Sequence, residues 1–317
     1  MSSSIVSAWQ RYWFSPAPCF DLAMVRIIVV AVHIFVTWHL LDAVTQRAAL
    51  PDEIWEPLVI LQLINLPFGF DFRPSLEALQ IMDAVCVVAG VLALVGLLTN
   101  LSLAVLAFTS VYLQAYLYSF GDFHHPEAAT MIALSVLAIS PSGRVLSVDS
   151  LLRRGRQAWQ DLLTAESQFA GWPIRLLQWF LVLMYLSAVW SKLWEGLDWP
   201  NGFTLQYYLI HDGLRWNSPF ALWLSQFHHL IWLGQLGVVA FQATFCLAVI
   251  FPILRWIYVP AGLTLHTFIF LSLKAPFFGW MALYSVFIPW RDAVLLVVSK
   301  VERGRAVAGE KAEAGLT

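Results

Sequence analysis

A lysine near the end of a long apolar run is the residue best placed to do chemistry. The run Tyr185-Leu-Ser-Ala-Val-Trp-Ser-Lys192 continues as Leu-Trp-Glu195-Gly-Leu-Asp-Trp199 and ends in a Pro-Asn-Gly turn. At about 100° per residue, Tyr185, Ala188, Lys192 and Glu195 share one helix face. A lysine that is partly removed from water is less stable as an ammonium and can accept a proton. Two alternatives stay open: Glu195 pairs with Lys192 and keeps it charged, or Lys192 only anchors the helix at a membrane interface.

Histidines are the second group of titratable side chains. In the topology derived below, most of them fall on the same membrane face as Lys192, and the one near mid-span, His33, is the exception. We therefore expect one polar cavity that opens toward the outer leaflet. For His33 and His266 the alternative is a core histidine that hydrogen-bonds to a neighbouring helix. The eight histidines are His33, His39, His124, His125, His211, His228, His229 and His266.

Other kinds of site lack their sequence signatures. The runs Phe123-His124-His125-Pro-Glu127 and His228-His229 offer metal ligands, but adjacent histidines on a helix diverge by about 100°. No His-Glu-x-x-His element accompanies them, so we assign no metal site. A nucleophile elbow, a phosphate loop and a dinucleotide glycine motif are also missing. No basic stripe suggests binding to nucleic acid.

Composition places these residues in a membrane protein. Of 317 residues, 60% are hydrophobic and 12% are charged, with a mean hydropathy of +0.71. Soluble domains carry about 25% charged residues. The three cysteines (Cys19, Cys86 and Cys246) are far apart and predict neither a disulfide framework nor a metal site. We expect a multi-pass protein of the cell membrane.

Apolar runs of about 20 residues predict the crossings. The fold class is an all-α polytopic bundle of about eight transmembrane helices. Residues 1–20 are expected to be an interfacial segment, 21–300 the transmembrane bundle, and 301–317 a disordered cytoplasmic tail. The predicted spans are roughly 21–42, 78–98, 101–119, 125–141, 172–194, 229–251, 254–273 and 276–290.

The distribution of charge orients this bundle. If all eight segments cross and both termini are cytoplasmic, 13 of the 18 lysines and arginines lie on the cytoplasmic side, which leaves five outside. That asymmetry follows the positive-inside rule, and one missed span would destroy it. On the cytoplasmic side, Pro141-Ser-Gly-Arg144 predicts a turn. The following Ser147-Val-Asp149 provides a serine or aspartate cap for a short basic amphipathic helix on anionic lipid.

Three segments of the chain resemble the vitamin K-dependent gamma-carboxylase-like membrane proteins, also called HTTM (horizontally transferred transmembrane) proteins. The likeness spans roughly residues 15–300, and it depends on the order and spacing of motifs that are individually weak. The segments are Tyr185…Ser191-Lys192-Leu193…Asp198-Trp199…Gly202; His124-His125 with Pro141-Ser-Gly-Arg144…Ser147-Val148-Asp149; and Leu265-His266 through Phe278-Gly-Trp280-Met281 to Phe287-Ile-Pro289-Trp290.

The resemblance implies a site and a reaction. Lys192 would be the base that deprotonates vitamin K hydroquinone or a related quinol, and oxygenation to an epoxide would be coupled to carboxylation. His125 (or His124) and His266 would match the active-site histidines. The expected cofactor contacts are His124, Tyr185, Trp199 and Glu195.

Two hypotheses from different classes follow. In the first, the outward-facing cavity binds a quinol or another lipid-soluble molecule, and Lys192 acts as base in a lyase and epoxidase type of reaction. In the second, the same cavity serves a non-enzymatic membrane protein that binds or transports a lipid-soluble small molecule. Membrane lipid is the expected partner in both hypotheses, and the sequence identifies no protein partner.

Overall fold

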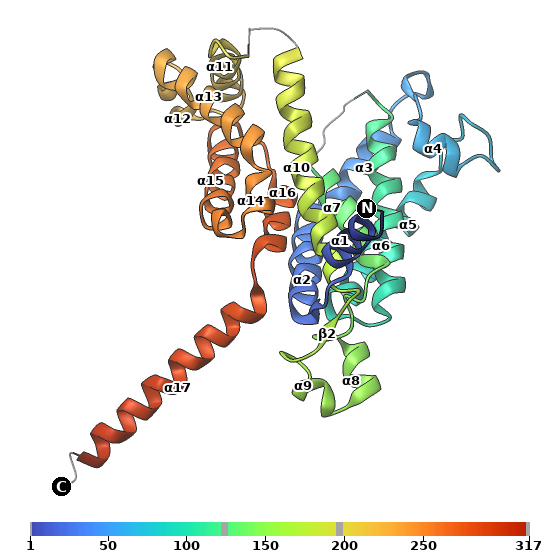
Figure 1. The fold of residues 1–317 in the computed structure, drawn as a ribbon. Coiled ribbons are helices and arrows are strands. Elements are labelled where there is room, and N and C mark those ends of the chain that lie inside the picture. Colours follow the sequence, from blue (N-terminus) through green and yellow to red (C-terminus); the bar gives the residue numbers. More distant parts are fainter. Residues whose placement is uncertain (1, 122–125, 195–198, 315–317) are drawn as a thin grey trace.

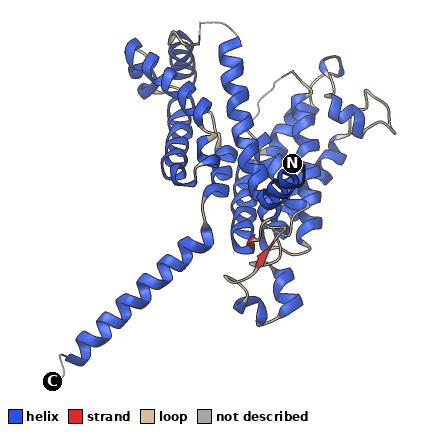
Figure 2. Ribbon diagram, in the orientation of Figure 1, coloured by secondary structure: helices blue, strands red, loops and turns tan. Residues whose placement is uncertain are grey.

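The computed structural model describes residues 2–121, 126–194 and 199–314, and these are almost entirely helical (Figure 2). Short 3-10 helices interrupt the chain at η1 (Asp52–Ile54), η2 (Pro252–Leu254) and η3 (Tyr284–Phe287). The α-helices are α1 (Ser2–Phe14), α2 (Cys19–Val36), α3 (Leu40–Ala48), α4 (Val59–Ile64), α5 (Leu76–Val95), α6 (Thr99–Tyr118), α7 (Ala128–Ala138), α8 (Val148–Arg154), α9 (Gln157–Gln160), α10 (Gly171–Trp194), α11 (Phe203–Arg215), α12 (Pro219–Leu224), α13 (His228–Thr244), α14 (Leu247–Ile250), α15 (Arg255–Leu273), α16 (Phe278–Leu283) and α17 (Trp290–Ala314).

Long apolar helices make this a membrane protein. Among the described residues, α2, α5, α6, α10 and the segment Pro252–Leu273 are long and apolar enough to cross a bilayer. A sixth span is formed if Phe278–Phe287 and Trp290–Arg303, which meet at a 71° bend, are taken together. On α5, Val87, Val88 and Val91 are each more than half exposed. Helices suit this environment because they satisfy their own backbone hydrogen bonds in lipid.

The remaining predicted spans take shorter or broken forms. The described part of 125–141 is the 11-residue apolar helix α7. The predicted span 229–251 is divided into α13 and α14, with Phe245 and Cys246 between them. Residues 276–290 form α16 and η3 and then bend into α17. The apolar runs are therefore helical where expected, but their lengths differ from the prediction.

A two-stranded ribbon defines one end of the bundle. Strands β1 (Ala17–Pro18) and β2 (Glu166–Ser167) pair in antiparallel register, and Cys19 N donates to Ala165 O at 3.0 Å. Because β1 leads directly into α2 and β2 shortly precedes α10, these two helices start side by side. We call this the ribbon end, and α8 and α9 lie there as well (Figure 1). The opposite end, which carries α11 and α12, is called the α11 end.

The Ser147-Val-Asp149 turn locks the ribbon end. The Ser147 hydroxyl accepts from Ser150 N and caps α8, as predicted. The Asp149 carboxylate accepts from Leu98 N (2.9 Å) and from Thr99 N (2.8 Å) at the start of α6. Arg26 of α2 is fully buried and donates to the carbonyls of Ser142 (2.9 Å) and Leu146 (2.5 Å). Together these hydrogen bonds tie α2, α6 and α8 to one another.

Close packing at this lock requires a glycine. Gly96 ends α5 with φ = 73°, a left-handed conformation that L side chains rarely adopt. A Cβ at this position would lie 2.9 Å from Arg26 Nη1 and 2.5 Å from Ser147 Cβ. The sequence of the α5–α6 turn is thus fitted to the buried arginine.

The last helix leaves the bundle. In Figure 1, α17 extends away from the other helices at the ribbon end. Its later turns cover residues 301–314, where the sequence led us to expect a disordered tail. Alanine, glutamate, lysine and arginine dominate this stretch, and all four have high intrinsic helix propensity. The disordered tail, 301–317, stays a prediction.

Candidate functional site

Tyr185, His266 and Tyr284 form a buried hydrogen-bonded chain in the second half of the bundle. Tyr185 Oη lies 3.0 Å from His266 Nε2 and also contacts Tyr284 Oη. All three side chains are buried, and His266 is only 6% exposed. They come from α10, α15 and η3, so three segments far apart in sequence contribute one polar group each. Two of the three residues, Tyr185 and His266, were selected from the sequence.

An aromatic shell and a glycine position these groups. The Tyr185 ring packs edge-on against Phe245, with centroids 4.8 Å apart, and His266 lies 5.5 Å from the Phe277 ring. Gly262 of α15 lies against Tyr284 so closely that a Cβ there would overlap the tyrosine ring and hydroxyl. The glycine therefore allows Tyr284 to approach α15 and reach Tyr185.

One ring nitrogen in the hydrogen-bonded series Tyr185–His266–Tyr284 has no hydrogen-bond partner among the described residues. His266 Nδ1 is buried and has no hydrogen bond within the described part of the chain. If Tyr284 donates to Tyr185 and Tyr185 donates to His266 Nε2, then Nδ1 carries an unpaired N–H. If the protons run the other way, Nδ1 is an unpaired acceptor. Leaving a buried polar group without a hydrogen bond costs about 1–3 kcal/mol. A ligand that hydrogen-bonded to Nδ1 would remove this cost and would therefore bind more tightly.

Lys192 lies on the same helix as Tyr185, toward the α11 end. Seven residues separate the two, a rise of about 10 Å along α10. Lys192 is half-buried, donates to Ala188 O at 3.1 Å, and places Nζ 4.9 Å from the centroid of the Trp199 ring. The fold thus brings together two residues that were selected from the sequence, Lys192 and Trp199. Both contacts favour the ammonium form of the lysine.

Three of the predicted site residues lie outside the described residues. These are His124 and His125, which precede α7, and Glu195, which follows α10. Their predicted roles, including the possible pairing of Glu195 with Lys192, stay predictions.

His33 belongs to a satisfied core network. Thr130 Oγ1 donates to Glu127 O (2.9 Å), so it must accept from His33 Nδ1–H at 3.0 Å. His33 Nε2 is then the acceptor for Ser110 Oγ–H at 2.7 Å, and Cys86 Sγ lies 3.5 Å from the same hydroxyl. The network links α2, α5, α6 and α7. His33 is therefore a core histidine that hydrogen-bonds to neighbouring helices, which the sequence left open as the alternative to a site residue.

The other described histidines are spread over separate elements. His39 precedes α3 and lies 3.8 Å from Asp42. His211 contacts Asp212 at 2.9 Å in α11, and His228 contacts Gln206 at 2.9 Å between α13 and α11. Two cavities toward the α3 side, one lined by Asp52 and Arg73 and one by Gln114 and Glu127, contain no histidine among the described residues. The expected single cavity that gathers the histidines stays a prediction. Within the described residues, no group of three or more His, Cys, Asp or Glu side chains is placed to hold a metal.

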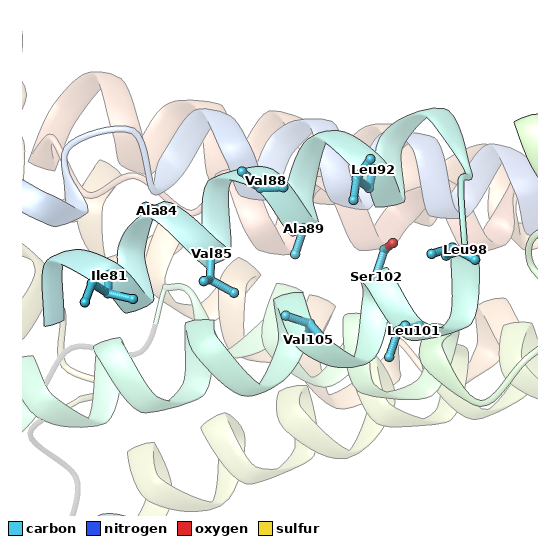
Figure 3. A pocket seen from close by; sticks show the side chains of 10 residues that line it. All are labelled: Ile81, Ala84, Val85, Val88, Ala89, Leu92, Leu98, Leu101, Ser102 and Val105. Carbon is cyan, nitrogen blue, oxygen red and sulfur yellow. The ribbon is translucent and has the colours of Figure 1, made fainter. Parts of the chain in front are cut away.

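One groove is apolar and lies on the outer surface of the bundle. It lies between α5 and α6, with a volume of about 430 Å³ (Figure 3). Its only polar side chain is Ser102; the others are Ile81, Ala84, Val85, Val88, Ala89, Leu92, Leu98, Leu101 and Val105. Without a titratable group, this groove offers contact area for acyl chains but no chemistry.

The sequence did not single out Tyr284, Gly262 or Phe245. Tyr284 lies in the third resembling segment, but nothing in a run of aromatic residues marks one of them as the partner of Tyr185. The signal available in the sequence was that a buried tyrosine such as Tyr185 needs a hydrogen-bond partner. Comparison with known proteins gives no match: no family model, no curated protein and no solved structure is significantly similar to this chain.

Proposed function

We propose that the bundle crosses the membrane eight times, with the ribbon end and both termini on the cytoplasmic side. Parity supports this count. One cavity is lined by the starting turns of α2, α10 and α15, so these helices begin at the same end. Helices that start at the same end are separated by an odd number of crossings. Between α2 and α10, α5 and α6 supply two, and α7 supplies the third. Between α10 and α15, α13 with α14 supplies one. After α15, α16 with η3 is the eighth, because η3 lines the same ribbon-end cavity.

We propose further that the buried Tyr185–His266–Tyr284 chain binds the polar head of a lipid-soluble quinol. The observation that carries this proposal is His266 Nδ1, a buried nitrogen without a partner in the described chain. A quinol hydroxyl can donate or accept, so it can complete either proton arrangement of the chain. The aromatic residues around it, Phe245 and Phe277, suit a flat ring.

Lys192 is the proposed base. Its neutral amine would take the proton of a quinol hydroxyl, which gives a quinolate and an ammonium. To do so, the side chain must leave Ala188 O and the Trp199 ring, because both stabilise the charged form. The resemblance to the carboxylase-like family implies that molecular oxygen then converts the quinolate to an epoxide.

Lysine substitution tests this reaction in vesicles supplied with vitamin K hydroquinone. We expect Lys192→Ala and Lys192→Arg to lower epoxide formation about a hundredfold or more, the usual contribution of a general base. The matched control is Lys274→Ala. Lys274 also follows a long helix that ends toward the α11 end, and its ammonium also lies over an aromatic ring, that of Phe270. Full epoxide formation by Lys192→Ala would show that Lys192 is not the base.

Binding is measured separately from turnover. Quinone quenching of tryptophan fluorescence should weaken in His266→Ala and stay unchanged in Lys192→Arg. Quenching that is identical in wild type and His266→Ala would contradict the proposed binding site.

Transport of a lipid-soluble molecule through the same region is the second candidate. Broken helices favour it: α13 ends beside α14, η2 follows, and Pro260 lies inside α15. Transporters build their sites at such interruptions. If uptake into vesicles occurs and is unaffected by Lys192→Arg, transport replaces catalysis as the function.

A further inference from the structure

The cavity at the ribbon end, where α2, α10 and α15 start, is polar and lies away from Lys192. Its volume is about 170 Å³, and the start of α2, the start of α10, the start of α15 and η3 surround it. The ionisable lining residues are Asp21, Arg175 and Arg255, and the uncharged polar ones include Gln178 and Ser285. Two guanidinium groups and one carboxylate give the lining a net charge of +1. Placing ionisable groups around a cavity inside an apolar membrane bundle costs free energy unless a counter-charge is present.

The two arginines keep unused donors. Arg255 donates through Nε to Ala248 O at 3.1 Å, and its two Nη groups have no acceptor among the described residues. Arg175 uses Nη1 and Nη2 for Trp13 O (3.1 Å) and Ser15 Oγ (2.7 Å), both in the segment that leads into α2. Both side chains are half-buried, so the remaining N–H groups are only partly accessible to water. A guanidinium with free N–H groups is a strong partner for phosphate oxygens.

A buried hydroxyl faces the same space. Ser285 Oγ has no hydrogen-bond partner in the described residues, although the side chain is only 5% exposed and lines the cavity. Its backbone carbonyl is occupied by Trp290 Nε1 at 3.0 Å. An unsatisfied hydroxyl in a cavity that two arginines also line would be satisfied by a ligand oxygen that accepts from it.

The helix directions add to the positive potential. Gly171 and Ile174, in the first turn of the 24-residue helix α10, line the cavity, and Arg255 is the first residue of α15. The starting turn of a helix carries unpaired N–H groups and a partial positive charge that favour anions. Asp21 opposes this field, but its Oδ1 already accepts from Arg291 N at 2.7 Å.

From these groups we infer that the cavity binds a phosphate-type anion, with the singly charged phosphodiester of an anionic membrane lipid as the matching form. A net charge of +1 balances one negative charge, and Asp21 disfavours a doubly charged phosphate. The interfacial helix α1, which Arg175 holds against α10, carries Trp9 and Tyr12 as exposed aromatic side chains at this end. Such residues prefer the headgroup layer.

Native mass spectrometry of the full chain tests this inference. The protein is exchanged into vesicles of phosphatidylglycerol, released in mild detergent, and examined for retained lipid. We expect Arg255→Gln to lower lipid retention about tenfold, as does loss of a charge-assisted hydrogen-bond partner. Ser285→Ala should lower it less, and it removes only an unpartnered hydroxyl, so it keeps the test valid if Arg255→Gln fails to fold. The control is Arg153→Gln, an exposed arginine on α8 at the same end.

A second arm separates the two sources of the anion. Inorganic phosphate alone is titrated into delipidated protein, with thermal stability as the readout. Stabilisation that is lost in Arg255→Gln, without lipid retention in the first arm, assigns the site to free phosphate and supports the anion site. Lipid retention and phosphate response that are the same in wild type, Arg255→Gln and Ser285→Ala would overturn the inference. Lys192→Arg should change neither readout, so this test does not depend on the proposed quinol chemistry.

Discussion

At the scale of single residues, Gly262 decides whether the chain of Tyr185, His266 and Tyr284 can form at all, because it lets Tyr284 lie against α15. We expect Gly262→Ala to destabilise the protein by about 1–3 kcal/mol, the usual cost of overpacking. Thermal unfolding in detergent measures this cost. In Tyr284→Phe, the clashing hydroxyl is absent, so the same glycine change should cost less.

The control for this change is another helical glycine. A Cβ at Gly237 of α13 meets nothing within 4 Å, so Gly237→Ala should be neutral or stabilising by up to about 1 kcal/mol. Equal losses at Gly262 and Gly237 would show that the close approach of Tyr284 is not the cause.

Asp149 gives a residue-level prediction that depends on pH. Burial raises the pKa of this carboxyl, but hydrogen bonds from Thr99 and Leu98 outweigh burial and hold the pKa below its usual value of 3.8. Because the folded pKa is depressed, the stabilisation is complete above the unfolded pKa and is lost as the pH falls through the folded pKa. We expect Asp149→Asn to cost about 1 kcal/mol near neutral pH, like the loss of a helix cap.

The measurement is unfolding of both proteins from about pH 7 to about pH 3. The difference between wild type and Asp149→Asn should shrink at the acid end, where the wild-type carboxylate becomes protonated. A difference that stays constant over the whole range would contradict the role of the charge.

At the scale of elements, the sequence predicts the long helices well and their ends poorly. Apolar runs are sufficient for α2, α5, α6, α10 and α15, because length and composition alone decide a span. The same rule overextends α7 and joins α13 to α14, since it does not detect a break inside an apolar run. The ribbon of β1 and β2 was not predicted, because two residues per strand carry no periodic pattern.

The predicted site divides in the same way. Lys192 and Trp199 share a local stretch, so their contact could be expected from spacing along the chain. The partners of Tyr185 come from α15 and η3, and only the packing of these distant elements brings them together. His33 and His266 looked equivalent in sequence, yet one has both ring nitrogens bonded and the other has one free of partners in the described chain.

The hydrogen bonds of Arg26 at the ribbon end give a prediction about how α2 is held to the turn before α8. Arg26 is buried and bonds two carbonyls in the turn between α7 and α8. We expect Arg26→Met to destabilise the protein by about 3 kcal/mol or more, because both carbonyls lose a charged donor in a buried site. Thermal unfolding in detergent compares it with Arg153→Met, an exposed arginine of α8. A loss no larger than that of Arg153→Met would show that the turn is held by other contacts.

At the scale of the whole molecule, charge asymmetry and the parity of helix starts support the same number of crossings from different observations. The charge argument counts lysines and arginines between apolar runs, and it uses no structure. The parity argument uses only the shared starting end of α2, α10 and α15. Agreement of the two favours α7 and α13 as crossings, although α7 has only 11 residues. A short helix crosses if the bilayer thins locally or if neighbouring chain completes the path.

Side-specific labelling of two exposed glutamines tests this orientation. In a background without Cys19, Cys86 and Cys246, Gln226→Cys reports on the α11 end and Gln160→Cys on the ribbon end. In intact cells, a membrane-impermeant maleimide should label Gln226→Cys and should reach Gln160→Cys only after the membrane is permeabilised. Among the predicted spans, only α10 separates the two cysteines, so they lie on opposite sides if α10 crosses. Labelling of both cysteines from the same side would reject α10 as a crossing and with it the eight-span arrangement. Labelling of Gln160→Cys alone would place the ribbon end and its arginine-lined cavity at the outer leaflet.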